Sequence, residues 1–162
     1  MSEDRLESDQ PLVQVSRRLE ASHSLDEIVT ILRDTARQIA GSDSIAVVLR
    51  EGDCCHYVAE DAIGYLWRGK RFPLDTCISG WAMLNNQTAI VPDIEADPRL
   101  PAAAYHHTSM RSLVMVPIGS PEPVAALGAY WCSFVTIDPG TVYRLEALAE
   151  SAGTALARIQ GS

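Results

Sequence analysis

The sequence has no long apolar run and no basic cluster. None of its hydrophobic stretches reaches the roughly 18 residues that a membrane-spanning helix needs. Lys and Arg number 13 against 21 Asp and Glu, which gives a net charge of −8, and no basic run is longer than Arg17-Arg18. Because an acidic surface repels phosphate groups, these absences argue against nucleic acid and an anionic membrane as partners.

Cysteine is scarce and follows no recognisable spacing. Cys54, Cys55, Cys77 and Cys132 include no Cys-x-x-Cys pair, so neither a structural zinc site nor a disulfide scaffold is indicated. Reduced thiols, together with a polar N-terminal segment unlike a secretory signal, predict a cytoplasmic protein. Cys54 and Cys55 should face opposite sides of a strand. Cys77 precedes a predicted helix, whose free amides would stabilise a thiolate, although an inert packed thiol is the simpler interpretation.

Apolar residues, in contrast, make up 47% of the 162 positions, enough for one domain with its own core. Residues 1–10 are expected to be a flexible lead-in, and residues 11–160 a single domain. A capping box at Ser24 and Glu27 predicts where the second helix begins, and Gly41 where it stops. The hydrophobic patterns predict helices over 11–22, 25–40, 78–85 and 138–159, and strands over 44–50, 54–60, 88–91, 112–118 and 124–134.

The predicted hairpins imply an antiparallel sheet and an α+β fold. Two of the strands, within 112–118 and 124–131, are apolar on both faces, so both faces of the sheet must be covered. The three long helices can cover one face, which leaves residues 61–110, mostly loop, for the other. A loop-covered sheet face is a common place for a binding site, so the sequence predicts a small-molecule pocket there.

Several segments carry a family resemblance. Ile78-Ser79-Gly80-Trp81, Pro92-Asp93-Ile94, Leu113–Ile118 and Ala126-Leu127-Gly128 resemble the corresponding pieces of GAF domains, over about residues 12–159. The resemblance implies a central antiparallel sheet of five to six strands, with helices on one face and a loop-covered pocket on the other. It also implies a sensing or signal-relay module of a bacterial signalling protein, not an enzyme, joined to or working with an output domain such as a histidine kinase. It leaves the ligand and any cofactor unknown.

Subtypes of the family are distinguished by single positions. Bilin-binding members have Asp-Ile-Pro where this chain has Asp93-Ile94-Glu95, and the chain lacks their cysteine over 103–107. Free methionine sulfoxide reductases have Gly-Val-Cys-Gly, which aligns with 77–80 and places Ser79 where the thiol belongs. Their second thiol, expected near Ala103, is missing as well. Such a reductase, or a structural dimerisation domain with a vestigial pocket, remains the alternative.

The candidate ligand contacts combine aromatic walls, imidazole and guanidinium groups near the predicted pocket. They are Trp67, Phe72, Cys77, Trp81, Asp93, Tyr105, His106, Arg111 and Met115. The competing interpretation is that the aromatic side chains fill the sheet face themselves and that His106-His107 is solvated. In that case Arg99 and Arg111 brace the loop by pairing with its acidic residues.

The last predicted helix carries an apolar stripe with steps of three and four residues: Val142, Leu145, Ala149, Ala152, Leu156 and Ile159. This heptad spacing is typical of a coiled-coil seam. It predicts a parallel homodimer through Leu145, Ala149, Ala152, Leu156 and Ile159, joined by Leu12, Val15 and Leu19. The alternative is that the stripe packs on the chain's own sheet and second helix.

Overall fold

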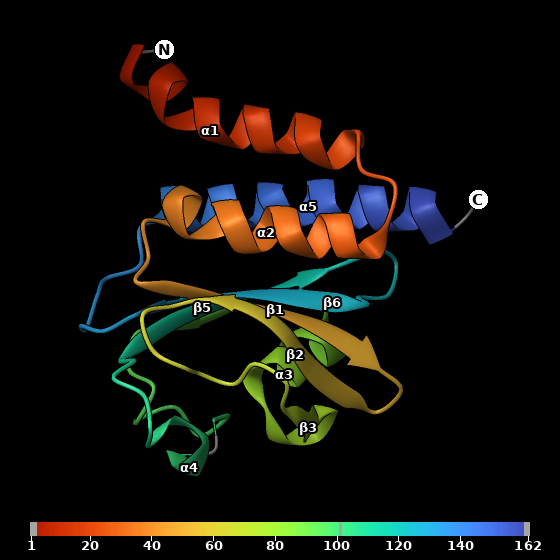
Figure 1. Ribbon diagram of the computed structural model, residues 1–162. Coiled ribbons are helices and arrows are strands. Elements are labelled where there is room, and N and C mark those ends of the chain that lie inside the picture. Colours follow the sequence, from red (N-terminus) through yellow and green to blue (C-terminus); the bar gives the residue numbers. More distant parts are fainter. Residues whose placement is uncertain (1–2, 101, 161–162) are drawn as a thin grey trace.

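The helices and strands follow one another in nearly the predicted order (Figure 1). The computed structural model describes residues 3–100 and 102–160. The elements are α1 (Glu3–Glu20), α2 (Leu25–Ala40), β1 (Ser44–Glu51), β2 (Cys54–Asp61), β3 (Arg71–Pro73), the 3₁₀ helix η1 (Leu74–Thr76), α3 (Ile78–Asn85), β4 (Ala89–Val91), α4 (Ala102–Tyr105), β5 (Ser112–Ile118), β6 (Ala125–Trp131) and α5 (Pro139–Gln160). The first helix begins at Glu3 rather than at residue 11, and β3 and α4 lie in the segment expected to be irregular. No helix in the described part of the chain could cross a membrane.

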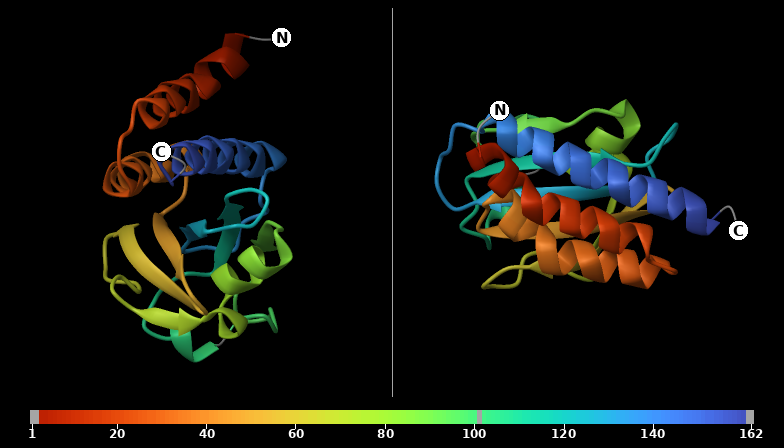
Figure 2. Two further views of the ribbon diagram at one scale, coloured as in Figure 1. Left: turned by 90° about the vertical axis from the view of Figure 1, so that its right-hand side faces the viewer. Right: turned by 90° about the horizontal axis from the view of Figure 1, so that it is seen from above.

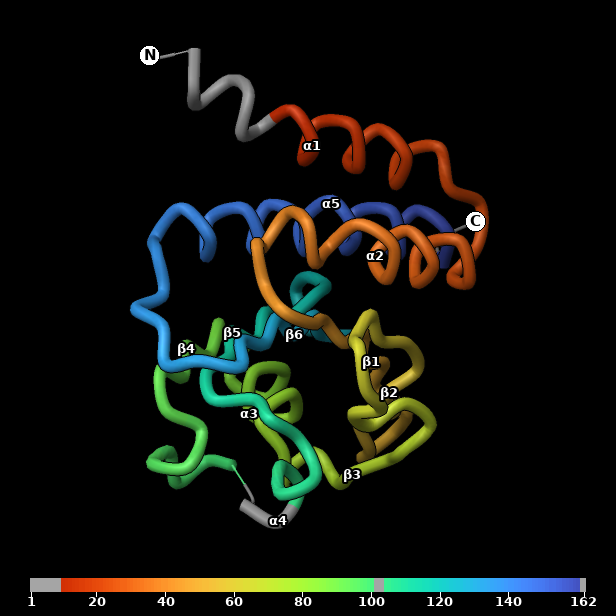
Figure 3. Tube along the Cα trace, turned by 60° about the vertical axis from the view of Figure 1, so that its left-hand side comes forward, coloured from red at the N-terminus to blue at the C-terminus, as the bar shows by residue number. Residues whose placement is uncertain are grey.

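The strands form one antiparallel sheet of six, in the order β3-β2-β1-β6-β5-β4, which confirms the predicted α+β class. Helices α2 and α5 lie side by side on one face, with α1 across them as an outer layer (Figure 2). Helices α3 and α4 lie on the opposite face (Figure 3). We call residues 62–100 and 102–110, apart from the edge strands β3 and β4, the cap. The sheet therefore separates a helix-side core from a cap-side core.

Helix α2 shows how local sequence sets these elements. The Ser24 hydroxyl accepts the Glu27 amide at 3.1 Å, and the Glu27 carboxylate accepts the His23 amide at 2.6 Å. Gly41 ends the helix at φ 66°, and its amide donates to the carbonyl of Arg37. The predicted capping box and helix stop are thus confirmed, and they fix the point at which the chain turns into β1.

A register shift in the first hairpin decides which side chains reach the cap. The pairing of β1 with β2 slips between Val47 and Val48. On one side of the slip Cys55 and Tyr57 face the cap-side core, whereas Ala59, beyond it, joins the helix-side core. The bulge thus brings a thiol and a phenol under the cap.

The predicted dimer seam has its partners within the chain. Leu145, Ala149, Ala152 and Leu156 are at most 4% exposed, and Ile159 packs against the same helix-side core. Leu12, Val15 and Leu19 are also buried there, at 8% exposure or less. The heptad spacing arises because α5 packs on the sheet, α1 and α2. This burial within one chain favours the alternative that the stripe packs on the chain's own sheet and helices, and the homodimer stays a prediction.

Candidate functional site

Four aromatic side chains gather between the sheet and the cap. The ring of Trp67 lies 5.1 Å from that of Tyr130, 5.1 Å from that of Tyr105 and 5.8 Å from that of Tyr57, measured between centroids. Trp67 and Tyr57 are 3% and 4% exposed, and Tyr130 is fully buried. Trp67 thus occupies the centre of the face on which the sequence predicts a pocket.

The backbone around Trp67 is held by a single carboxylate. Glu60, near the end of β2, accepts the amides of Leu66, Trp67 and Arg68 at 2.8 to 2.9 Å. The indole N–H of Trp67 then donates to the carbonyl of Ala104 at 2.8 Å. These bonds fold the chain after β2 back over the sheet and tie it to α4.

Little room remains beside Trp67. The cavity lined by Tyr57, Trp67, Phe72, Cys77, Ala104 and Tyr105 has a volume of about 10 Å³. Because a single water needs roughly 10–15 Å³ in such a measure, the chain's own side chains fill the predicted pocket. A larger ligand could enter only if lining side chains such as Trp67 moved.

The hydroxyl of Tyr130 stands out in this core. Its oxygen is the buried side-chain polar atom without a hydrogen-bond partner among the described residues. Burial raises the pKa of this phenol well above its ordinary value. A Cβ built on Gly128 would lie 2.8 Å from this oxygen and 2.7 Å from the end of Met115, so only glycine leaves room for the ring. An unpaired buried hydroxyl typically costs about 1–3 kcal/mol.

Two thiols meet beneath the cap. The sulfur of Cys77, at the start of α3, lies 3.3 Å from the sulfur of Cys55 on β2 and 3.4 Å from the Ser79 hydroxyl. That hydroxyl is also 2.9 Å from the Tyr57 hydroxyl. As a thiol, Cys77 donates to the Cys55 sulfur and to the Pro73 carbonyl at 3.5 Å. The contact with Cys55 lowers the pKa of Cys77 to about 6 despite burial, with help from Ser79 and the Gly80 amide. The same contact and burial raise the pKa of Cys55.

The structure divides the predicted ligand contacts into groups. Trp67, Phe72, Cys77 and Tyr105 line the small cavity together. Tyr105 also borders an open hollow of about 470 Å³, which His106 and Arg111 line as well. Both of these are exposed side chains.

The remaining predicted contacts lie apart from these two spaces. Trp81 is covered by the guanidinium of Arg99, 4.5 Å from its ring centre. The Asp93 carboxylate accepts the amide of Glu95 in a local turn. Met115 is fully buried in the cap-side core. These three stabilise the cap and its core, as the competing interpretation expects.

The sequence did not place Cys55, Ser79, Tyr130 or Glu60 among the site residues. Cys55 and Tyr57 are two positions apart on a strand, which indicates a shared face, but no sequence signal places Cys55 against Cys77. Within the described ranges no three metal-ligating side chains gather at one point.

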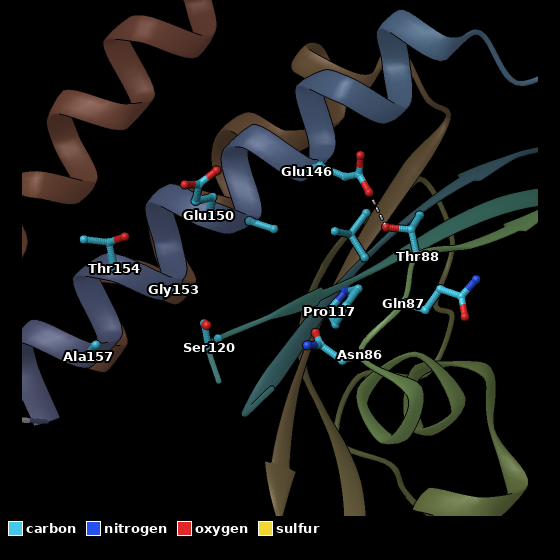
Figure 4. Close-up of a pocket in the computed structure, with 13 residues that line it drawn as sticks. Asn86, Gln87, Thr88, Pro117, Ser120, Glu146, Glu150, Gly153, Thr154 and Ala157 are labelled. Atoms are coloured by element: carbon cyan, nitrogen blue, oxygen red, sulfur yellow. Dashed lines mark hydrogen bonds between the residues drawn. The ribbon is translucent and has the colours of Figure 1, made fainter. Parts of the chain in front are cut away.

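A larger groove of about 660 Å³ lies elsewhere, between α5 and the β4–β5 edge of the sheet (Figure 4). Glu146 and Glu150 of α5 border it, and the Thr88 hydroxyl donates to Glu146 at 2.7 Å. At one end the chain is very close to itself: a Cβ built on Gly153 would lie 3.1 Å from the amide nitrogen of Gly119. The groove is thus bordered by both α5 and the turn after β5.

This layout, a six-stranded antiparallel sheet with packed helices on one face and a capped aromatic site on the other, is that of a GAF-like α+β domain. The sequence profile of the GAF domain family matches residues 22–157. The chain belongs to this family.

Solved structures agree on the fold. A GAF domain from an Acinetobacter phosphoenolpyruvate-protein phosphotransferase has a TM-score of 0.81 at 13% identity, covering 99% of this chain and 98% of that one. A free methionine-R-sulfoxide reductase from Neisseria meningitidis, solved with its substrate, has a TM-score of 0.80 at 19% identity, covering 99% and 95%. The chromophore-binding domain of a bacteriophytochrome from R. palustris has a TM-score of 0.79 at 18% identity, covering 99% of this chain and 64% of that one. No curated protein matches the sequence. These identities show the fold alone.

Proposed function

We propose that this chain is a regulatory GAF domain, which senses a small molecule under its cap and passes a change to its helical layer. The observation that most supports sensing is the unpaired Tyr130 hydroxyl. It lies in an aromatic core beside Trp67, where a planar ligand with a polar edge would satisfy it after displacing the indole.

Strands β5 and β6 supply the path from the site to the helices. Tyr130 and Met115 face the cap, while Val114, Val116 and Leu127 on the same two strands face α2 and α5. The turn after β5 then meets α5 by backbone contact at Gly153. A shift of these strands on ligand binding would therefore move α5.

Helix α5 is the element from which an output would follow. It is 22 residues long and ends at Gln160. It would carry the change to a fused or separate output domain such as a histidine kinase, or to a second copy in a homodimer, in the cytoplasm. Sedimentation equilibrium of the whole chain tests the homodimer.

A free methionine sulfoxide reductase is the second candidate, because two sulfur atoms lie 3.3 Å apart beneath the cap. Ser79, however, takes the position of one family thiol, and the cavity at Cys77 is too small for an amino acid. Dithiothreitol-dependent turnover of free methionine sulfoxide, abolished in Cys77→Ala, would favour the reductase.

The sensing proposal is tested by native mass spectrometry and an absorbance scan of protein purified from its own host. We expect wild type to retain a small molecule that Tyr130→Phe loses, while the ligand-free variant gains about 1 kcal/mol of stability because no buried hydroxyl is left unpaired. Tyr143→Phe, at a residue 58% exposed, is the matched control. Wild type without any bound mass, and Tyr130→Phe no more stable than wild type, would contradict the proposal.

A further inference from the structure

The contact between Cys55 and Cys77 joins two separate parts of the cap-side core. Cys55 belongs to β2, and Cys77 is the N-cap residue immediately before α3. Their sulfur atoms are 3.3 Å apart, and a disulfide bond is about 2.05 Å long. Closing that gap requires the two sulfur atoms to approach each other by roughly 1.3 Å.

The two thiols differ in chemical character. Once Cys77 is ionised it can only accept hydrogen bonds, so its contacts with Cys55, Ser79 and the amide of Gly80 stabilise the thiolate and lower its pKa. Cys55 is fully buried, and its contact with the Cys77 sulfur together with burial raises its pKa, so that it stays a thiol. The pair thus contains one thiolate that can attack an oxidant and, in contact with it, a second sulfur that can attack the oxidised product.

Access to the pair is selective by size. Cys77 is 7% exposed and borders the cavity of about 10 Å³ between Tyr57, Phe72 and Tyr105, whereas Cys55 has no exposed surface. Because Cys77 keeps this small exposure and Cys55 keeps none, a small oxidant from solvent meets Cys77 first. A bulky thiol or peroxide would first have to displace the aromatic side chains.

We propose that Cys55 and Cys77 form a redox site, which hydrogen peroxide oxidises to an intramolecular disulfide. The Cys77 thiolate attacks one peroxide oxygen, so that an S–O bond forms, the O–O bond breaks and hydroxide leaves. The sulfur is oxidised by two electrons to a sulfenic acid, and the peroxide is reduced. The Cys55 sulfur then attacks the sulfenic sulfur, the S–S bond forms, and the S–O oxygen leaves as water with the Cys55 proton. An external dithiol restores both thiols by exchange.

Oxidation would couple this chemistry to the fold. The new bond would fix the start of α3 to β2, next to Ser79 and its contact with the Tyr57 hydroxyl. The site does not depend on the proposed sensing function, because it needs no ligand other than the oxidant.

The test treats the reduced whole chain with hydrogen peroxide near pH 7, followed by acid quenching, alkylation under denaturing conditions and peptide mapping. We expect two of the four thiols to become protected and the mapped link to join Cys55 to Cys77. A Cys54→Ala/Cys132→Ala double variant should behave as wild type. The rate with cumene hydroperoxide should be lower by roughly tenfold or more, because this bulky peroxide does not fit the cavity.

Single variants separate the two roles. In Cys55→Ala, dimedone should trap a sulfenic acid on Cys77, formed more slowly than in wild type because the thiolate has lost its donor. Cys77→Ser should show no peroxide-dependent modification of Cys55. Circular dichroism confirms that each variant is folded. A link through Cys54 or Cys132, or oxidation no faster than in the urea-unfolded chain, would overturn the proposal.

Discussion

Gly80 offers the sharpest test of how the cap is packed. It lies in the first turn of α3, against η1. A Cβ built on Gly80 would lie 1.8 Å from the carbonyl oxygen of Leu74, 2.5 Å from its carbonyl carbon and 2.6 Å from its Cα. These are backbone atoms, so no change of side-chain rotamer can relieve the clash in Gly80→Ala.

The size of the effect follows from these distances. Real Cβ atoms essentially never approach other heavy atoms within 3.0 Å, so α3 and η1 would have to separate by more than an ångström. Overpacking typically costs about 1–3 kcal/mol, and a clash with backbone atoms lies at the upper end, at about 3 kcal/mol or more. Alanine returns about 1 kcal/mol of helix propensity. We expect a net loss of about 2 kcal/mol or more, or a Tm lower by roughly 4–8 °C.

Urea unfolding followed by circular dichroism measures this loss. Gly64→Ala is the matched control, because nothing lies within 4 Å of a Cβ there. It should change the free energy of unfolding by less than about 0.5 kcal/mol. A Gly80→Ala curve that superimposes on wild type would refute the described packing of α3 on η1.

Other perturbations test the helical layer, the thiol pair and the turn after β2. Leu156→Ala should lower the free energy of unfolding by about 2–5 kcal/mol without changing the sedimentation mass, since this side chain is buried within one chain. Leu84→Ala, at a residue 55% exposed, should leave both the free energy of unfolding and the sedimentation mass unchanged. Folding lowers the pKa of Cys77 from 9.0 to about 6. The free energy of unfolding of wild type relative to Cys77→Ala should therefore rise between about pH 6 and pH 9, and this gain should be lost as the pH falls through 6. Urea titrations at several pH values measure the difference, and a difference that does not change with pH would contradict the shift. Glu60→Gln should speed hydrogen exchange at the amides of Leu66 and Trp67, because both donate hydrogen bonds to the Glu60 carboxylate. Unchanged protection of these amides would show that other contacts hold the turn.

The elements that the sequence predicted well are those set by neighbouring residues. Ser24, Glu27 and Gly41 fix both ends of α2 through contacts within a few positions. The strands 112–118 and 44–50 and the helix 78–85 agree with β5, β1 and α3 to within a residue. Apolar strands with two covered faces likewise predicted the cap correctly, because burial constrains every position of a strand.

The site was harder to predict, because its contacts join distant segments. Cys55 meets Cys77 only because β2 slips by one residue against β1 and α3 packs beneath it. Trp67 lies in the pocket because the Glu60 carboxylate accepts three backbone amides. No sequence motif predicts this arrangement. The stripe on α5 was found, but its period is the same for a partner within the chain and for a second chain, so spacing alone could not choose between them.

Trp67 gives the site a built-in competitor for any ligand. Moving this buried indole into water costs roughly 3 kcal/mol, so the fraction of molecules with an open site is small and lowers the apparent affinity by roughly 100-fold. In Trp67→Ala the space is already empty, and a ligand identified by native mass spectrometry should bind by isothermal titration up to about 100-fold more tightly. The indole N–H would no longer donate to Ala104, so α4 should exchange its amides faster in the free variant. Binding weakened in Trp67→Ala would mean instead that the indole contacts the ligand directly, as a wall of the pocket and not its occupant.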